Sequence, residues 1–279
     1  MLIGSSGYLG SELFYFFKNN RNKIIRVSSK NGSDYNYNEI HHLKSFKNFD
    51  IIFILSGLDE SKSINLKKAI KVKKQVLESL LKLSIYVKLK KIFYFSSVKV
   101  YSDKLIGQIS ENNKIFSNSI YSKAHLYAEK YLIDNYKNSN FTILRLSNVY
   151  GSLINSNKGN KYILNNLLKS LSKNKKFTIK SKSDFYRDFI CIDYFLYVIQ
   201  FLVKKNPRVK ILNLCRGKMY NILEIVDKLN KIHKKNFNEP FPIIHNININ
   251  LNINKKFSTS KLEKLNIKKL KYLKLSKFI

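Results

Sequence analysis

The sequence predicts an α/β protein in which a doubly wound parallel sheet is followed by a smaller C-terminal lobe. The chain opens with three apolar residues that run into glycines at positions 4, 7 and 10. Continuous apolar runs, typical of parallel strands buried on both faces, then alternate with segments of helical periodicity. No proline interrupts the first 206 residues. Together these patterns indicate strand–helix units joined into one parallel sheet.

The opening segment, residues 1–10, is typical of a strand, a tight turn and a helix start. Glycines in this arrangement let a backbone approach a pyrophosphate closely and place it at the N-terminus of the following helix. Ordinary turns also contain glycine triplets, but the apolar run before this one and the helical pattern over 11–20 favour dinucleotide binding. We assign to the cofactor site Gly4, Gly7, Tyr8, Leu9 and Gly10.

The next two strands are expected at residues 23–28 and 50–56, and each ends in a serine. An acidic residue at the end of the second strand commonly selects the free ribose 2′-hydroxyl of NAD. Here the sequence is Ser28-Ser29-Lys30, which suits a 2′-phosphate and favours NADP over NAD, although an ordinary solvated strand end fits equally well. We add Ser28 and Ser56 to the cofactor site and expect NAD or NADP as the cofactor.

The remaining elements follow the same alternation and then loosen after Gly151. We expect a dinucleotide-binding domain over 1–150 and a substrate-binding lobe over 151–279, with some later segments packing back on the first domain. The tail from residue 245 alternates asparagine with isoleucine or leucine and has edge-strand character. The expected helices are 61–84, 119–138, 162–172, 193–203 and 220–233, and the expected strands are 91–97, 141–146, 189–192 and 209–214.

The net charge of +34 calls for a basic surface, but the lysines are spread along the chain rather than gathered in one block. We interpret them as a compositional bias at tolerant surface positions, which predicts an anionic small-molecule ligand and neither nucleic acid nor membrane as a partner. No apolar run approaches the roughly 20 residues of a membrane helix. Cys191 and Cys215 lie in apolar runs and are expected to be buried in a reducing compartment, so we predict no metal site and a cytoplasmic location.

Five ordered motifs resemble the extended short-chain dehydrogenase/reductase family, in particular its NAD-dependent epimerases and dehydratases that modify nucleotide sugars. They are the glycine spacing of residues 4–10, Phe-Ser-Ser-Val-Lys-Val-Tyr at 95–101, Tyr-Ser-Lys-Ala-His at 121–125, Asn-Val-Tyr-Gly at 148–151 and Arg-Asp-Phe-Ile at 187–190. The resemblance runs along nearly the whole chain. It implies a Rossmann-type sheet, NAD(P) chemistry on a nucleotide-diphosphate sugar for surface-polysaccharide precursors, and a homodimer.

The resemblance also implies the catalytic residues. Tyr121 matches the family's tyrosine, which exchanges a proton with the sugar hydroxyl, and Ser97 matches the hydroxyl that hydrogen-bonds the reacting oxygen. The family places a lysine four residues after the tyrosine, where this chain has His125. A protonated His125 would lower the pKa of Tyr121, so we expect His125→Lys to keep or raise turnover. The alternative is a catalytically weakened dinucleotide-binding protein of the same fold.

The residues beside the catalytic positions reduce the number of reactions that the site could catalyse. Val98 and Lys99 stand where the family's dehydratases have an acidic pair for eliminating water, so dehydratase activity is disfavoured. An epimerase or a 4-keto reductase remains, and the missing carboxylate after the second strand tilts the choice towards reductase. Asn148 and Arg187 match substrate positions, and the planar guanidinium of Arg187 suits diphosphate oxygens.

Overall fold

The computed structural model describes residues 1–18, 22–29, 32–102, 104–116, 119–136, 140–152, 154, 159, 162–172, 177–179, 186–237, 243–245 and 255–268. The chain forms two compact units, each discontinuous in sequence. The first combines Met1–Lys104, Glu111–Leu146 and Ile199–Leu214. The second combines Leu105–Ser110, Ser147–Val198 and Cys215–Ile279. The chain therefore leaves the first unit at Leu146 and returns to it at Ile199.

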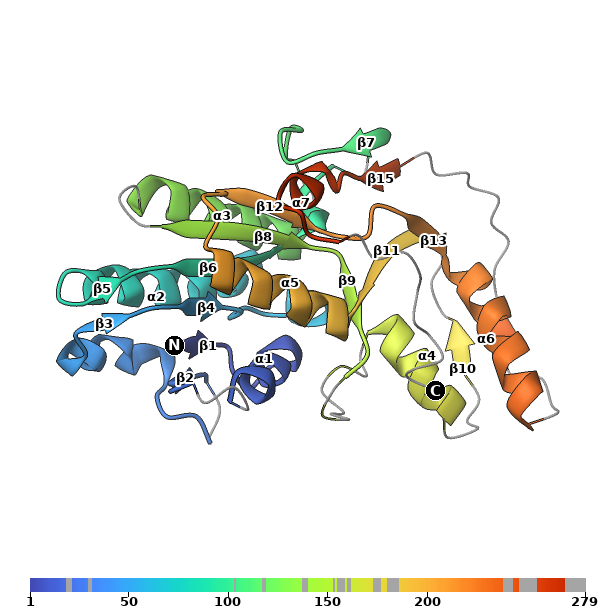
Figure 1. Ribbon diagram of the computed structural model, residues 1–279, viewed down its shortest axis with the longest axis horizontal. Helices are drawn as coiled ribbons and strands as arrows, with labels where there is room; N and C mark the ends of the chain where they lie inside the picture. The colour runs from blue at the N-terminus through green and yellow to red at the C-terminus, as the bar shows by residue number, and fades with distance from the viewer. Residues whose placement is uncertain are drawn as a thin grey trace. The chain divides into compact units, whose positions relative to one another are not determined.

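The first unit contains a six-stranded sheet, which confirms the predicted fold class (Figure 1). The strand order is β12-β8-β6-β4-β1-β2, and every neighbouring pair is parallel. Because β2 and β4 lie on opposite sides of β1, the chain reverses its winding direction between β1 and β4, where such sheets bind ligands. The strands are β1 Leu2–Ile3, β2 Arg26–Val27, β4 Ile52–Ile54, β6 Ile92–Ser97, β8 Phe141–Leu146 and β12 Ile211–Leu214.

Alternate residues of the central strands supply two apolar faces. One face joins Ile52 and Ile54 to a core with α2 (Leu66–Ser84), α3 (Ile120–Asn135) and the 3₁₀ segment η1 (Tyr37–Ser45). The other face carries Phe53, whose ring lies 5.4 Å from that of Phe17 on α1 (Tyr8–Lys18). This alternation is the period-two pattern of a sheet buried on both sides.

Local capping explains where the helices begin. Helix α1 starts at Tyr8, three residues before the predicted start, because the turn closes with the Gly7 N–H donating to the Gly4 carbonyl at 3.1 Å. Helix α2 starts at Leu66 because the side chain of Asn65 accepts the Lys68 N–H. The predicted helix at 61–84 therefore begins late, after the 3₁₀ turn η2 (Glu60–Lys62).

The described residues of the second unit form three small sheets. In the first, β9 (Asn148–Tyr150) runs parallel to β11 (Tyr186–Cys191), which pairs antiparallel with β13 (Met219–Asn221). Most of the tail predicted as an edge strand lies outside the described residues. The other two sheets pair β7 Gly107–Ile109 with β15 Lys255–Phe257 and β10 Phe177–Ile179 with β14 Ile243–His245.

The remaining elements are short or shared between the units. Helix α5 (Ile192–Lys205) begins in the second unit and ends in the first. Both Cys191 and Cys215 are buried, as expected. In the part of the chain described, no helix combines the length and apolar character needed to cross a bilayer. Also present are η3 Val98–Val100, β3 Asn48–Phe49, β5 Lys88–Leu89, α4 Ile163–Ser172, α6 Ile222–Phe237 and α7 Ser260–Lys264.

Candidate active site

The glycine turn lies at the switch point, where the carboxyl ends of β1 and β4 meet. Gly4 has φ +89°, and a Cβ there would lie 2.8 Å from the carbonyl carbon of Leu55 and the nitrogen of Ser56. A Cβ on Gly10 would collide with the Gly4 carbonyl and lie 2.9 Å from its carbon. Both positions therefore require glycine because backbones pack against each other.

The residues around this turn fit a dinucleotide. The Ser11 N–H donates to the Gly7 carbonyl at 2.9 Å, which closes the first turn of α1. At a helix N-terminus the backbone N–H groups of the first turn point out of the helix. Such a helix start favours an anion. The Ser56 hydroxyl, 4% exposed, has no hydrogen-bond partner among the described residues. A buried donor beside a glycine turn is suited to a polar ligand group.

The end of β2 gives no support to the NADP preference. Ser28 is fully buried, and its hydroxyl lies 2.5 Å from the hydroxyl of Ser33. Lys30, the cation on which the preference also rested, lies outside the described residues. The Ser28 hydroxyl is thus used within the protein rather than directed at a phosphate.

The carboxyl end of β6 carries Ser97, which caps the turn η3 by accepting the Lys99 N–H at 3.2 Å. Val98 is buried, and the Lys99 ammonium pairs with Glu60 at 2.6 Å. Helix α3 packs against both β6 and η3, and its first turn carries the partly exposed Tyr121. The structure therefore brings the Ser97 strand and the Tyr121 helix together in the first unit.

His125 lies behind Tyr121, one turn further along α3. The two rings are 4.6 Å apart and nearly perpendicular, and His125 is only 6% exposed. Its Nδ1 atom is 3.0 Å from the Tyr94 hydroxyl on β6. Lys123, by contrast, points to solvent on another face of α3, as the two-residue offset from Tyr121 predicts.

Sequence reasoning missed a buried lysine in this cluster. The Lys73 ammonium, on α2, lies 3.0 Å from the Tyr94 hydroxyl and 3.5 Å from His125 Nδ1. It also donates to the Ser56 carbonyl at 3.4 Å, which connects the cluster to the glycine turn. Lys73 is one of ten lysines between residues 61 and 91, and it was therefore not singled out from the sequence. The available signal was its spacing from Ala69, Val76 and Leu80, on the buried face of α2.

The electrostatics of the cluster correct the expected charge on His125. Burial, and then the charge of Lys73, hold the pKa of His125 well below its usual 6.5. Burial lowers the pKa of Lys73 to about 7, although the charge of Glu129 opposes the shift. Burial raises the pKa of Tyr94. His125 is therefore neutral at neutral pH, and Lys73 is the group that can carry the positive charge.

A buried ion pair holds α3 against the sheet beneath this cluster. Both Glu129 oxygens accept from Arg145 on β8, at 2.7 and 3.2 Å, and Glu129 also accepts from the Ser96 hydroxyl at 2.5 Å. Arg145 donates as well to the Tyr101 hydroxyl at 3.0 Å, which donates to Asn213 at 2.6 Å. Every side chain in this hydrogen-bond network is nearly fully buried and has a hydrogen-bond partner.

The predicted substrate residues lie in the second unit. Asn148 on β9 donates to the Asp188 carbonyl at 3.0 Å, and Arg187 on β11 is partly buried. Asp188, the next residue, is 1% exposed and therefore takes no part in a surface ion pair. Its carboxylate accepts the backbone N–H groups of residues 216–218 at 2.7 to 3.1 Å. Asp188 therefore shapes a loop.

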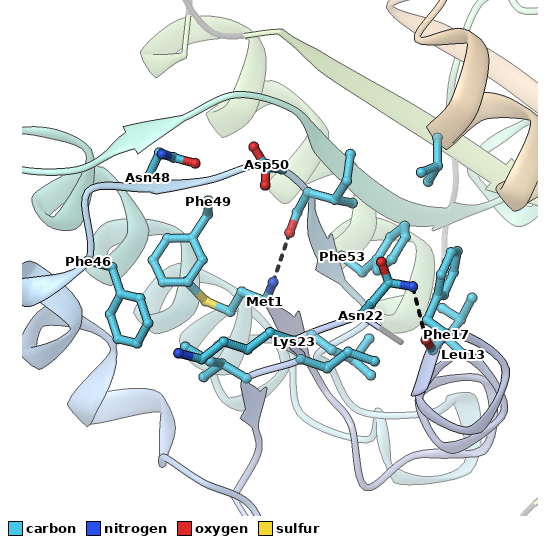
Figure 2. Close-up of a pocket in the computed structure, with 15 residues that line it drawn as sticks. Met1, Leu13, Phe17, Asn22, Lys23, Phe46, Asn48, Phe49, Asp50 and Phe53 are labelled. Carbon is cyan, nitrogen blue, oxygen red and sulfur yellow. Dashed lines mark hydrogen bonds between the residues drawn. The ribbon is translucent and has the colours of Figure 1, made fainter. Parts of the chain in front are cut away.

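A pocket of about 300 Å³ lies at the other end of the strands, beside the starts of β1 and β4 (Figure 2). Phe46 and Phe49 lie on one side of it, and Phe17 and Phe53 on the other. Because Gly4 and Ser56 follow the opposite ends of these strands, we do not include the pocket in the site. Among the described residues, no group of histidine, cysteine and carboxylate side chains could hold a metal ion.

Comparison with solved structures supports the same architecture. A UDP-glucose 4-epimerase from Thermotoga maritima, solved with UDP-glucose, matches with a TM-score of 0.79 and 15% identity over 99% of this chain and 94% of that chain. A UDP-glucuronic acid 4-epimerase from Bacillus cereus, solved with UDP-glucuronic acid and NAD, matches with a TM-score of 0.77 and 19% identity over the same shares. A Bacillus cereus UDP-N-acetylglucosamine 4-epimerase matches with a TM-score of 0.73 and 18% identity, over 98% and 91%.

Comparison with curated protein sequences gives no match. At the identities above, the solved structures establish the fold. The family model described as "NAD dependent epimerase/dehydratase family" matches residues 1–222, which is most of the chain. The protein therefore belongs to the NAD-dependent epimerase/dehydratase family.

Proposed function

We propose that this protein is an NAD-dependent epimerase that inverts a hydroxyl-bearing carbon of a nucleotide-diphosphate sugar. The strongest support is an unbroken series of contacts within the first unit. Gly4 abuts Ser56, the Ser56 carbonyl accepts from Lys73, and Lys73 reaches His125, whose ring packs on Tyr121. A turn suited to a pyrophosphate and a tyrosine suited to proton transfer are thus parts of one site.

Each residue in the site has a distinct role in this proposal. When bound, NAD supplies the hydride acceptor for the sugar carbon. Tyr121 takes the proton of the sugar hydroxyl and later returns it, which requires the partial exposure that it has. Ser97, at the end of β6, orients the reacting oxygen. Gly4 to Gly10 and Ser56 hold the dinucleotide, and Asn148 and Arg187 hold the sugar nucleotide.

We favour epimerase over reductase, and NAD over NADP. The three similar solved structures described above are 4-epimerases, and the UDP-glucuronic acid 4-epimerase from Bacillus cereus was solved with NAD. Dehydratase chemistry remains disfavoured, since the residues after Ser97 are a buried valine and a lysine paired with Glu60. That arrangement lacks the acid and base that elimination of water needs.

Direct assay of candidate substrates tests the proposal. Purified protein with NAD is incubated with UDP-glucose, UDP-N-acetylglucosamine and UDP-glucuronic acid, and the sugars are identified by NMR. We expect one of them to reach an equilibrium mixture with its 4-epimer, without net change in NADH absorbance. Stoichiometric consumption of NADPH with a 4-keto sugar would favour a reductase instead.

A second candidate is a dinucleotide-binding protein with weakened catalysis. The observation that favours it is the neutral, buried His125 at the position where the family has a lysine. Calorimetric NAD binding at micromolar affinity, together with no turnover of any sugar nucleotide in the panel, would support this candidate over the epimerase.

A further inference from the structure

Lys73 is a buried basic residue whose side chain contacts uncharged groups of the candidate active site. It is 3% exposed, and its ammonium makes polar contacts with the Tyr94 hydroxyl, the Ser56 carbonyl and His125 Nδ1. Gly57 makes room for it, because a Cβ at that position would lie 2.8 Å from the Lys73 nitrogen. The position of the ammonium is thus fixed by contacts with β6, with α3 and with the segment of Ser56 and Gly57.

The donors and acceptors in this cluster allow a definite protonation pattern. A protonated lysine has three donors and no acceptor, so the Tyr94 oxygen accepts from Lys73 and the Tyr94 hydroxyl proton is left to donate. The nearest acceptor for that proton is His125 Nδ1, at 3.0 Å. An N–H at Nδ1 would instead face both the ammonium and the hydroxyl proton. The ring must therefore carry its single proton on Nε2.

We propose that Lys73 and Tyr94 lock His125 as its neutral Nε2–H tautomer, so that Lys73 is the cation of the site and His125 presents a hydrogen-bond donor beside Tyr121. Lys73 is a positioning residue, because it acts on the site through Tyr94 and His125. The inference rests on the proposed function only for what the donor binds, which would be the cofactor or the substrate. The tautomer itself does not depend on that function.

The charged and titratable groups around Lys73 are consistent with this role. Helix α3 contributes Tyr121, His125 and Glu129, and β6 contributes Tyr94. Among the described residues, the charge of Glu129 raises the pKa of Lys73, and Glu129 is already bound by Arg145. Burial outweighs this effect and lowers the pKa of Lys73 to about 7. Burial, and then the charge of Lys73, keep the ring of His125 unprotonated.

This pattern reverses the expectation that His125→Lys would keep or raise turnover. A lysine at 125 would bring a second ammonium against Lys73 in a buried site, which is unfavourable for both charges. We now expect His125→Lys to lose stability and activity. The double variant with Lys73→Met should recover part of both, because only one buried cation remains.

Long-range ¹H–¹⁵N NMR of the histidine rings tests the proposal directly. The chain has five histidines, and comparison with His125→Gln assigns the signals of His125. We expect the Nε2–H pattern and an unprotonated ring at about pH 6.5, below the pKa of about 7 at which Lys73 loses its proton. An Nδ1–H pattern, or a protonated ring at neutral pH, would overturn the proposal. The wild-type spectrum decides this even where a variant fails to fold.

Variants of α2 then test whether Lys73 is responsible. Lys73→Met should raise the pKa of His125, although burial still lowers it, and should mix the two tautomers, because the nearby charge is gone. The matched control is Lys71→Met, an exposed lysine on the same helix, which should change neither. An unchanged His125 spectrum in Lys73→Met would contradict the proposal. A correct spectrum in a protein that converts no sugar nucleotide would instead remove the proposed function and leave the tautomer lock standing.

Discussion

Tyr121 and His125 are neighbours on one helix, yet their surroundings give them opposite capacities. Tyr121 is partly exposed and can meet a substrate hydroxyl, whereas His125 is buried behind it against Tyr94. A group that exchanges protons with a ligand must be accessible, and a group that fixes geometry is best enclosed. At this scale we therefore assign proton transfer to Tyr121 and orientation to His125.

Replacing Tyr121 by phenylalanine removes the hydroxyl that we expect to exchange the proton. Turnover of the active sugar nucleotide should fall by about 10² to 10⁴, while the melting temperature and NAD affinity stay close to wild type. The matched control is Tyr127→Phe on the same helix, which should retain activity. Steady-state assays of both variants would refute the role of Tyr121 if they lost turnover equally, or if neither did.

Gly4→Ala tests the close packing at the switch point. The alanine would adopt φ +89° with its Cβ 2.8 Å from the Leu55 and Ser56 backbone, so we expect a loss of stability of about 2 kcal/mol or more and of NAD binding. Gly107→Ala is the control, since it has φ +74° but nothing within 4 Å of the new Cβ. Urea unfolding and calorimetry separate the two effects. Equal losses in both variants would show that position 4 requires glycine because of its backbone conformation alone, and not because of the close contact with Ser56.

At the scale of elements, the apolar runs predicted the strands well and the ends of the helices less well. Strand β8 has the predicted bounds, because its six residues are all buried and four of them are apolar. Helix α1 begins earlier than predicted, because two glycines hide the start of its periodicity. Lys73 shares the spacing of the buried face of α2, but its contacts with Tyr94 and His125 could not be predicted, because they depend on how α2 packs in the fold.

The Arg145–Glu129 pair joins β8 to α3, and its removal should disturb both elements. Arg145→Ala would leave a buried carboxylate without its partner, which we expect to cost about 3–5 kcal/mol of unfolding free energy. The control is Arg26→Ala, which breaks a pair with Asp34 whose side chains are 34% and 38% exposed, and should cost less than about 1 kcal/mol. Chemical denaturation measures both. Similar costs in the two variants would mean that the buried pair contributes no more than a surface one.

At the scale of the whole molecule, the sequence predicted the parallel sheet and a smaller second region, and motif resemblance predicted the family. The expectation that some later segments pack back on the first domain named none of them, because the return of β12 to the first sheet depends on pairing with β8. The roles of Asn148 and Arg187, and a homodimer, remain predictions. The net charge of +34 lies largely on exposed lysines, but the buried Lys73 makes stability depend on pH.

Stability should rise with pH across the range in which Lys73 titrates. Its folded-state pKa of about 7 lies below the ordinary 10.5, so between these values the unfolded chain binds a proton that the folded chain does not. Lys91, with its pKa lowered to about 8, contributes in the same direction. Below pH 6.5 the unprotonated His125 acts likewise, and stability falls as pH falls.

Urea unfolding at several pH values checks this dependence. Lys73→Met should reduce the slope between about pH 7.5 and 9.5 by up to about 1.4 kcal/mol per pH unit, the limit for one proton. Lys71→Met should leave the slope unchanged, since that lysine is exposed. A wild-type stability that decreased over this range would contradict the lowered pKa of Lys73.

The central claim is that the carboxyl edge of the parallel sheet holds NAD for chemistry at Tyr121. Native mass spectrometry of the protein, as purified and after incubation with equal NAD and NADP, tests this most directly. We predict one NAD per chain, no displacement by NADP, and loss of the bound mass in Gly4→Ala. A protein that carries no dinucleotide under either condition, or that binds NADP in place of NAD, would contradict the account.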